Sequence, residues 1–229
     1  MKLVHSLTLV LAISAISGFR SDDTFSLKHK VTKDEVLVSQ RTINISAEDS
    51  EIMMDMKTKE KVLRVEEDGA YEIEESLLSG TLKFNGEEQA MEKGEPKATK
   101  YDKDGKEIKK EGSTDEEADP VADVLNDVLD FEPKEPVKVG ETWKHDGEFG
   151  VMEMTLEGRE KVGEVDCLKV TVKGKLSKKD TVGDVTGTFY IRADDFSPQK
   201  MEAKIENPKL DADAPAMKLI EIKMTRTTE

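Results

Sequence analysis

The sequence contains few side chains that could carry out acid–base or nucleophilic chemistry. Among its three histidines, only His145 has an adjacent acid, Asp146. A hydrolase would also need an activated nucleophile, and the chain has no Gly-x-Ser-x-Gly sequence. His29 has no second histidine at a metal-binding spacing. Because an adjacent acid is common in a chain this acidic, we interpret His145 as a solvated loop residue and predict no catalytic residues.

Cys167 is the only cysteine, so an internal disulfide is excluded. It lies between Val165 and Leu168 in a stretch that alternates apolar and polar residues, which indicates a strand. We interpret it as a small buried thiol. An enzyme that uses Cys167, His145 or Asp146 is the weakest of three functional alternatives.

A calcium-binding loop is the nearest match to a metal site. Four residues coincide with positions three, five, six and twelve of such a loop: Asp102, Asp104, Gly105 and Glu111. Position one would be Lys100, which cannot coordinate calcium through its side chain. Residues 99–109 instead predict a charged hairpin with Asp104 and Gly105 at its tip. We therefore predict no metal site and no cofactor.

The second half of the chain has the alternation that is typical of half-buried strands. In residues 149–156, Met152, Met154 and Leu156 share one face, and polar residues occupy most of the other. The same period of two returns in residues 165–173, 186–192, 200–206 and 217–225. These segments predict an antiparallel sheet with one apolar and one solvated face.

The first half also favours strands. Residues 25–31 and 35–45 predict two strands joined by a turn. In residues 51–66, alternation places Ile52, Met54 and Met56 on one face, although the abundance of Met, Lys and Glu makes a helix the competing prediction. Residues 71–84 are less regular.

A charged region and one helix separate the two halves. Glu, Lys, Asp and Gly dominate residues 85–119, a composition typical of flexible insertions. Residues 120–131 predict an amphipathic helix, with Asp119 as N-cap and Pro120 at its first position. Its apolar residues recur at helical spacing: Val121, Val124, Leu125, Val128 and Leu129. The simplest place for this helix is over the apolar face of the sheet.

Two segments carry a resemblance to known proteins. The Val-Gly-Glu-Thr-Trp sequence at residues 139–143 and the segment 187–200 resemble an uncharacterised family of exported bacterial β-proteins. The second half of the chain is similar to the half-barrel of periplasmic lipoprotein carriers. This resemblance implies a strongly curved antiparallel sheet or half-barrel of about 8 to 11 strands, covered by the helix at residues 120–131. It implies no functional residue.

The first residues predict export. Lys2 precedes an apolar run from Leu7 to Ile16, and the small residues Ala15 and Ser17 suit cleavage before Gly18. We expect residues 1–17 to be a signal peptide and 18–229 a single β domain. The run is shorter than the roughly 20 apolar residues of a membrane span. The expected location is secreted or periplasmic, without a stable membrane anchor, and an uncleaved anchor is the alternative.

Charge narrows the choice of partners. With 35 basic and 50 acidic residues, the net charge of −15 argues against nucleic acid and anionic membranes. Aromatic residues make up 5% of the chain, which disfavours a stacking platform for bases or sugars. We expect a monomer.

Methionine suggests what the apolar face could bind. Ten methionines occur, and their side chains adapt to apolar shapes. The leading hypothesis is a non-catalytic protein that holds a lipid-like small molecule on the concave face of the sheet. The expected lining residues are Trp143, Met152, Met154, Leu156, Phe189 and Met201. The alternative is an envelope-associated structural or interaction module, in which these residues fill an ordinary core and the partner is another envelope protein.

Overall fold

Alternating apolar and polar residues fold most of the chain into long antiparallel strands. The computed structural model describes residues 23–103, 105–108, 124, 127, 132–178, 180–210 and 217–227. The strands within these ranges are β1 (Thr24–Phe25), β2 (Val36–Ala47), β3 (Glu51–Val65), β4 (Tyr71–Phe84), β5 (Glu87–Ala90), β6 (Lys97–Tyr101), β7 (Val137–Lys138), β8 (Thr142–Asp146), β9 (Gly150–Val162), β10 (Val165–Leu176), β11 (Val182–Arg192), β12 (Pro198–Lys209) and β13 (Met217–Thr227).

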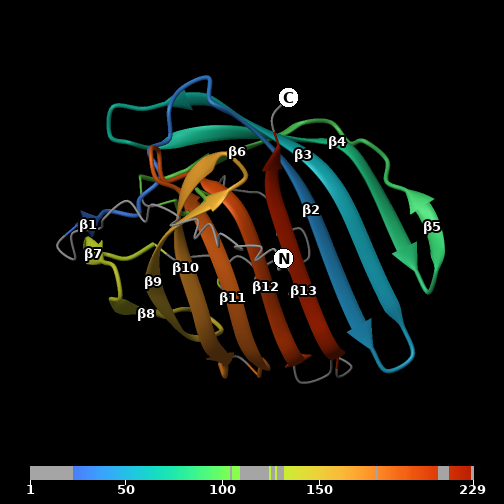
Figure 1. Ribbon diagram of the computed structural model, residues 1–229. Helices are drawn as coiled ribbons and strands as arrows, with labels where there is room; N and C mark the ends of the chain where they lie inside the picture. Colours follow the sequence, from blue (N-terminus) through green and yellow to red (C-terminus); the bar gives the residue numbers. More distant parts are fainter. Residues whose placement is uncertain are drawn as a thin grey trace, which may run out of the picture.

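Eleven strands form one sheet, in the order β5-β4-β3-β2-β13-β12-β11-β10-β9-β8, and β6 also pairs with β4. Figure 1 shows β9 to β13 side by side, with β2 to β4 continuing the sheet beyond β13. Pairing of β2 with β13 joins the two halves of the chain. In the described residues the edge strands β8 and β5 do not pair with each other, so the sheet is open. β1 and β7 form a separate two-stranded sheet.

One face of β9 to β13 carries the core. The fully or nearly buried side chains on this face include Met152, Met154, Leu156, Leu168, Val170, Val172, Leu176, Val185, Phe189, Ile191, Met201, Ala203, Ile205, Ile220 and Ile222. Residues from outside the large sheet complete the cluster: Phe25, Leu27, Val124, Val137 and Leu210. Phe25 and Val137 are register partners of β1 and β7, so the small sheet packs on the large one.

The opposite face is charged and solvated. Cross-strand neighbours of opposite sign are paired along it, with N–O distances of 3.0 Å for Lys144–Glu153 and 2.6 Å for Lys204–Glu221. Exposed pairs of this kind contribute at most about 1 kcal/mol each. Their main effect is therefore to specify which face is wet.

Most strand predictions are confirmed. The alternating segments of the second half are β9 to β13, and the predicted strand over residues 51–66 is β3 (Glu51–Val65) rather than a helix. The strand predicted over residues 25–31 was wrong, because only Phe25 of that range lies in a strand, β1. The less regular residues 71–84 form β4, and β-bulges shift its register against β3 between Lys57 and Thr58 and between Val62 and Arg64. The first shift leaves Leu78 of β4 without a register partner and so interrupts the period of two in this strand, which explains the weak sequence pattern.

Several predictions fall on residues that the structure does not describe. The signal peptide at residues 1–17 lies outside the described residues. So does the helix at residues 120–131, apart from Val124 and Asp127. In the charged region, residues 87–90 and 97–101 are strands β5 and β6, and a bridge between Tyr101 and Glu107 closes the predicted hairpin. Asp104 and Glu111, two residues of the calcium-like pattern, are not described.

Candidate functional site

His145 has a different partner from the one its sequence neighbour suggests. It lies on strand β8, not in a loop, and its Nε2 is 3.3 Å from Oδ1 of Asp127. Asp146 instead forms an ion pair with Lys178, whose ammonium group lowers the pKa of that carboxyl. The prediction of a solvated loop histidine was wrong, because β8 pairs with β9 and holds His145 opposite Met152.

Asp127 joins its segment to the turn between β8 and β9. Its carboxylate accepts hydrogen bonds from the backbone N–H groups of Glu148 (2.8 Å) and Phe149 (2.9 Å). A Cβ on Gly147 would lie 2.2 Å from Oδ1 of Asp127, so only glycine permits this approach. The arrangement has the geometry of a structural clamp, with the histidine as a third contact.

Cys167 is a buried free thiol, as predicted. Its Sγ donates to the carbonyl oxygen of Val165 at 3.7 Å. Burial raises the pKa of the thiol, which lowers its fraction of reactive thiolate. Among the described residues, no group of three or more His, Cys, Asp and Glu side chains is arranged to hold a metal ion. The described residues also contain no helix of the length and hydrophobicity that a bilayer crossing requires.

The six residues expected to line a ligand surface lie together on the core face of β8 to β12. Trp143 is opposite Met154, and Phe189 is opposite Met201. Five belong to the buried core cluster: Met152, Met154, Leu156, Phe189 and Met201. Trp143 is partly buried and packs against this cluster.

The same apolar face continues onto β2, β3 and β4. One cross-strand row runs from Met154 through Val172, Gly187, Ala203 and Ile222 to Ile43, Met54 and Leu82. A second row ends at Ile45, Ile52 and Phe84. Directly opposed residues of a sheet share a face. The core face is therefore one continuous apolar surface that crosses both halves of the sheet.

Burial changes along this surface. Met154, Val172 and Ile222 are buried, whereas Met54 and Leu82 in the same row are only half-buried. At the far corner, Phe84 is 51% exposed. We name this less buried part the β2–β4 apolar face and define it by seven half-buried residues and the exposed Phe84: Ile43, Ile45, Ile52, Met54, Met56, Leu82, Met91 and Phe84.

Met91 belongs to this face through its contact with β4. Its backbone N–H donates to the carbonyl oxygen of Gly80 at 2.9 Å. A Cβ on Gly80 would lie 2.9 Å from the Met91 sulfur, so this side chain covers the glycine. Gly80 is the register partner of Met56. Met54, Met56 and Met91 thus gather on one face of β3 and β4.

An ionic cluster ends the β2–β4 apolar face. Arg41, the register partner of Met56, forms ion pairs with Glu60 and, at 3.5 Å, with Glu75. Burial raises the pKa of Glu60, the charge of Arg41 opposes this shift, and the charge of Glu75 adds to it. Arg41 Nε also donates to Ser39 Oγ at 3.3 Å. A single guanidinium therefore serves two carboxylates beside the apolar residues.

Two tyrosines pair across β4 and β6, and the charges of Glu60 and Glu75 act on one of them, Tyr101. Tyr71 and Tyr101 are register partners on β4 and β6, and their rings stack with centroids 5.3 Å apart. Burial, together with the neighbouring phenol and carboxylates, raises the pKa of Tyr71 to about 12. Both phenols are therefore neutral donors at physiological pH.

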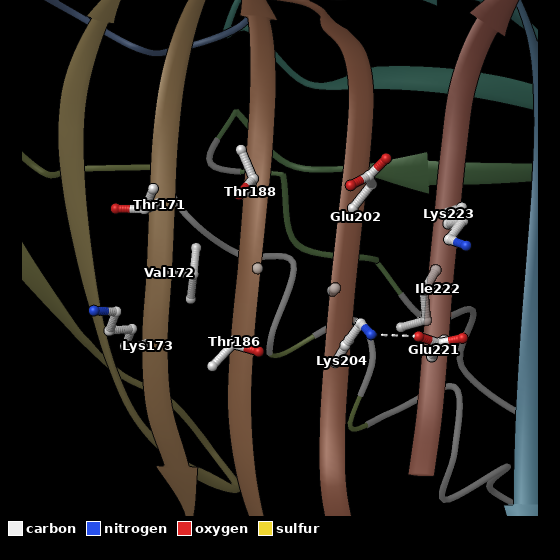
Figure 2. A pocket seen from close by; sticks show the side chains of 12 residues that line it. Thr171, Val172, Lys173, Thr186, Thr188, Glu202, Lys204, Glu221, Ile222 and Lys223 are labelled. Carbon is white, nitrogen blue, oxygen red and sulfur yellow. Dashed lines mark ion pairs between the residues drawn. The ribbon is translucent and has the colours of Figure 1, made fainter.

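A shallow depression of about 310 Å³ lies on the opposite, charged face. Figure 2 shows the threonine, lysine and glutamate side chains of β10 to β13 around it, including the ion pair between Lys204 and Glu221. Lys173, Lys223 and Glu202 add further charges to its lining. An open depression among charged groups does not suit an apolar ligand. None of the six expected lining residues contributes to it.

No protein-family model matches the sequence, and no curated protein matches it. The candidate site thus rests on the geometry described above.

The sequence contains a pattern that indicates the β2–β4 apolar face, although the predicted lining residues all lie in the second half of the chain. The alternation in residues 51–56 already placed Ile52, Met54 and Met56 together. The alternation does not predict how deeply each side chain of the apolar face is buried. The predicted lining residues Met152, Met154 and Met201 are buried, whereas the methionines of β3 are half-buried.

Proposed function

We propose that this chain is an exported, non-catalytic binding protein that holds an apolar, lipid-like ligand on the β2–β4 apolar face. The observation that carries the proposal is the change in burial along one cross-strand row, from buried Met154 to half-buried Met54. An apolar surface that continues a packed core favours a further apolar layer. Bound ligand would supply that layer.

The composition of the face favours a lipid-like ligand over a protein partner. Protein interfaces are enriched in Tyr, Trp and Arg anchors, whereas this face consists of Ile, Met and Leu with the single aromatic Phe84. Methionine adapts to flexible apolar shapes such as acyl chains. A second copy of the chain is disfavoured because each copy carries a net charge of −15.

The polar end of the face supports an amphiphilic ligand. Arg41 and its two carboxylate partners lie directly beside Met56. Ligand sites of this kind combine an apolar lining with a few polar groups that fix orientation. We therefore place the apolar part of the ligand on Met54 and Leu82 and its polar end near Arg41.

The proposal includes a strongly curved or half-barrel sheet and a covering helix over residues 120–131. Two described residues support the covering segment. Val124 is completely buried in the core cluster, and Asp127 is hydrogen-bonded to the turn between β8 and β9. The covering segment would then close the core over β9 to β13 and leave the β2–β4 apolar face to the ligand.

A structural or interaction module of the envelope is the second candidate. The observation in its favour is that the expected lining residues Met152, Met154 and Leu156 are fully buried, as in an ordinary core. In that case the sheet edges at β8 and β5, each of which pairs with one neighbour among the described strands, would be the available contact surfaces.

The first test is a binding titration with a fluorescent fatty-acid probe. The wild-type protein is compared with Met54→Glu, which places a charge on the apolar face, and with Met53→Glu on the opposite face of the same strand. Covering a carboxylate with an apolar ligand is unfavourable, so we expect Met54→Glu to weaken binding at least tenfold, about 1.4 kcal/mol. Met53→Glu should bind as the wild type does.

Native mass spectrometry of the protein from its own host provides the second measurement. A lipid that co-purifies in stoichiometric amount would support the proposal. The variant Leu82→Glu should then purify without this lipid. Circular dichroism shows whether the variants remain folded. Wild-type protein that binds neither probe nor lipid would contradict the proposal, and a dimer in the same spectra would favour the interaction module.

A further inference from the structure

We infer that Met54, Met56 and Met91 are peroxide-sensitive modification sites, and that their conversion to methionine sulfoxide releases the apolar ligand. The inference rests on the proposed function, because it assigns a control to the same surface. Its structural basis is independent of any ligand: three half-buried thioethers gather on one face of β3 and β4.

The three side chains form one group. Met54 and Met56 are two residues apart on β3 and therefore point to the same side. Met56 is opposite Gly80, and the Met91 sulfur covers Gly80. Oxidation at any of the three sites would introduce a polar group into the same part of the β2–β4 apolar face.

Burial separates these methionines from those of the core. Met152 and Met154 are completely buried, and Met201 is 7% exposed. Susceptibility to oxidation follows access of the oxidant to sulfur. The folded protein should therefore react first at the half-buried sites and keep the core methionines reduced.

The chemistry needs only hydrogen peroxide as oxidant. A lone pair on the thioether sulfur attacks one peroxide oxygen, the O–O bond breaks, and a sulfur–oxygen bond forms. The second peroxide oxygen leaves as water after taking up the proton released from the first. Sulfur loses two electrons and peroxide gains them, so the step balances without a metal or a cofactor.

The product changes the character of the surface. A sulfoxide is polar and accepts hydrogen bonds, whereas the thioether is a flexible apolar group. An apolar ligand that covers the sulfoxide would remove it from water without offering a donor, which is unfavourable. Oxidation is reversible by methionine sulfoxide reductases, so the release of ligand could be reversed.

The experiment treats folded protein with graded hydrogen peroxide and then divides each sample. Peptide mass spectrometry locates each added oxygen, and the fluorescent fatty-acid probe measures binding. We expect oxygen at Met54, Met56 and Met91 before Met152, Met154 and Met201, and at least a tenfold loss of affinity in the same samples. The affinity of the triple variant Met54→Leu, Met56→Leu and Met91→Leu, compared with its own value before treatment, should not fall in peroxide.

Met53→Leu is the matched control. Met53 is half-buried on the same strand but lies on the charged face, opposite Asn44 and Lys83. This variant should lose binding in peroxide as the wild type does. Core methionines that oxidise first, or fully oxidised Met54, Met56 and Met91 with unchanged affinity, would overturn the inference. Absence of binding by untreated protein would instead overturn the proposed function, and the oxidation map would still report which sulfurs peroxide reaches.

Discussion

At the scale of single residues, Asp127 shows how one carboxylate can fix a distant segment. It accepts from two consecutive backbone N–H groups and contacts His145, and its side chain is 10% exposed. The backbone donors of Glu148 and Phe149 would lose these acceptors in its absence. His145, which the sequence suggested to be a solvated loop residue, is therefore part of a structural contact.

Asp127→Ala should lower the free energy of unfolding by about 1–3 kcal/mol, because it removes two charge-assisted hydrogen bonds, an exposed one from Glu148 and a part-buried one from Phe149. Urea denaturation measures the change. Asp146→Ala is the matched control. Asp146 follows His145 in the sequence, but its carboxylate is solvent-exposed and paired with Lys178. An equal loss in both variants would show that Asp127 has no special role.

At the scale of elements, the two long sheet halves use the same apolar residues at different depths. Met154 on β9 and Met54 on β3 lie in one cross-strand row, but only Met154 is completely buried. Met154→Ala should cost about 2–5 kcal/mol, as expected for a cavity in a packed core. Met54→Ala should cost no more than about half of that, because less apolar surface returns to water. Thermal and urea denaturation of the two variants test the ratio, and equal costs would mean that β3 is as fully packed as β9.

The strands of the second half could be predicted because one face is buried and the other is charged. That difference in environment imposes the period of two on β9 to β13. The sequence could not predict the pairing of β2 with β13, because these strands are remote along the chain. Nor could it predict that Asp127 would be the partner of His145, since the contact depends on how the intervening segment returns to β8.

The candidate site was predictable in kind but not in place. Alternation identified an apolar, methionine-containing sheet face, and Met54 and Met56 were correctly grouped. The depth of burial depends on what packs above each strand. For β9 to β13, residues from outside the large sheet such as Leu27 and Val137 supply that layer, and no local pattern encodes their positions.

At the scale of the whole molecule, the structure combines a packed half with a less covered half in one hydrogen-bonded sheet. Local opening is governed by buried apolar contacts. Hydrogen–deuterium exchange should therefore be slowest in β10, β11 and β12, which have paired neighbours and buried side chains, and faster in β3, β4 and β5. Mass spectrometry of peptides from the folded protein measures this gradient.

A bound ligand should change only one end of that gradient. If an apolar molecule covers Met54 and Leu82, addition of the fatty-acid probe should slow exchange in β3 and β4 and leave β10 to β12 unchanged, because the latter are already buried. Peroxide treatment before the probe is added should abolish the protection. Protection that appears instead at the edge strand β8 (Thr142–Asp146) would contradict the placement of the ligand on β3 and β4.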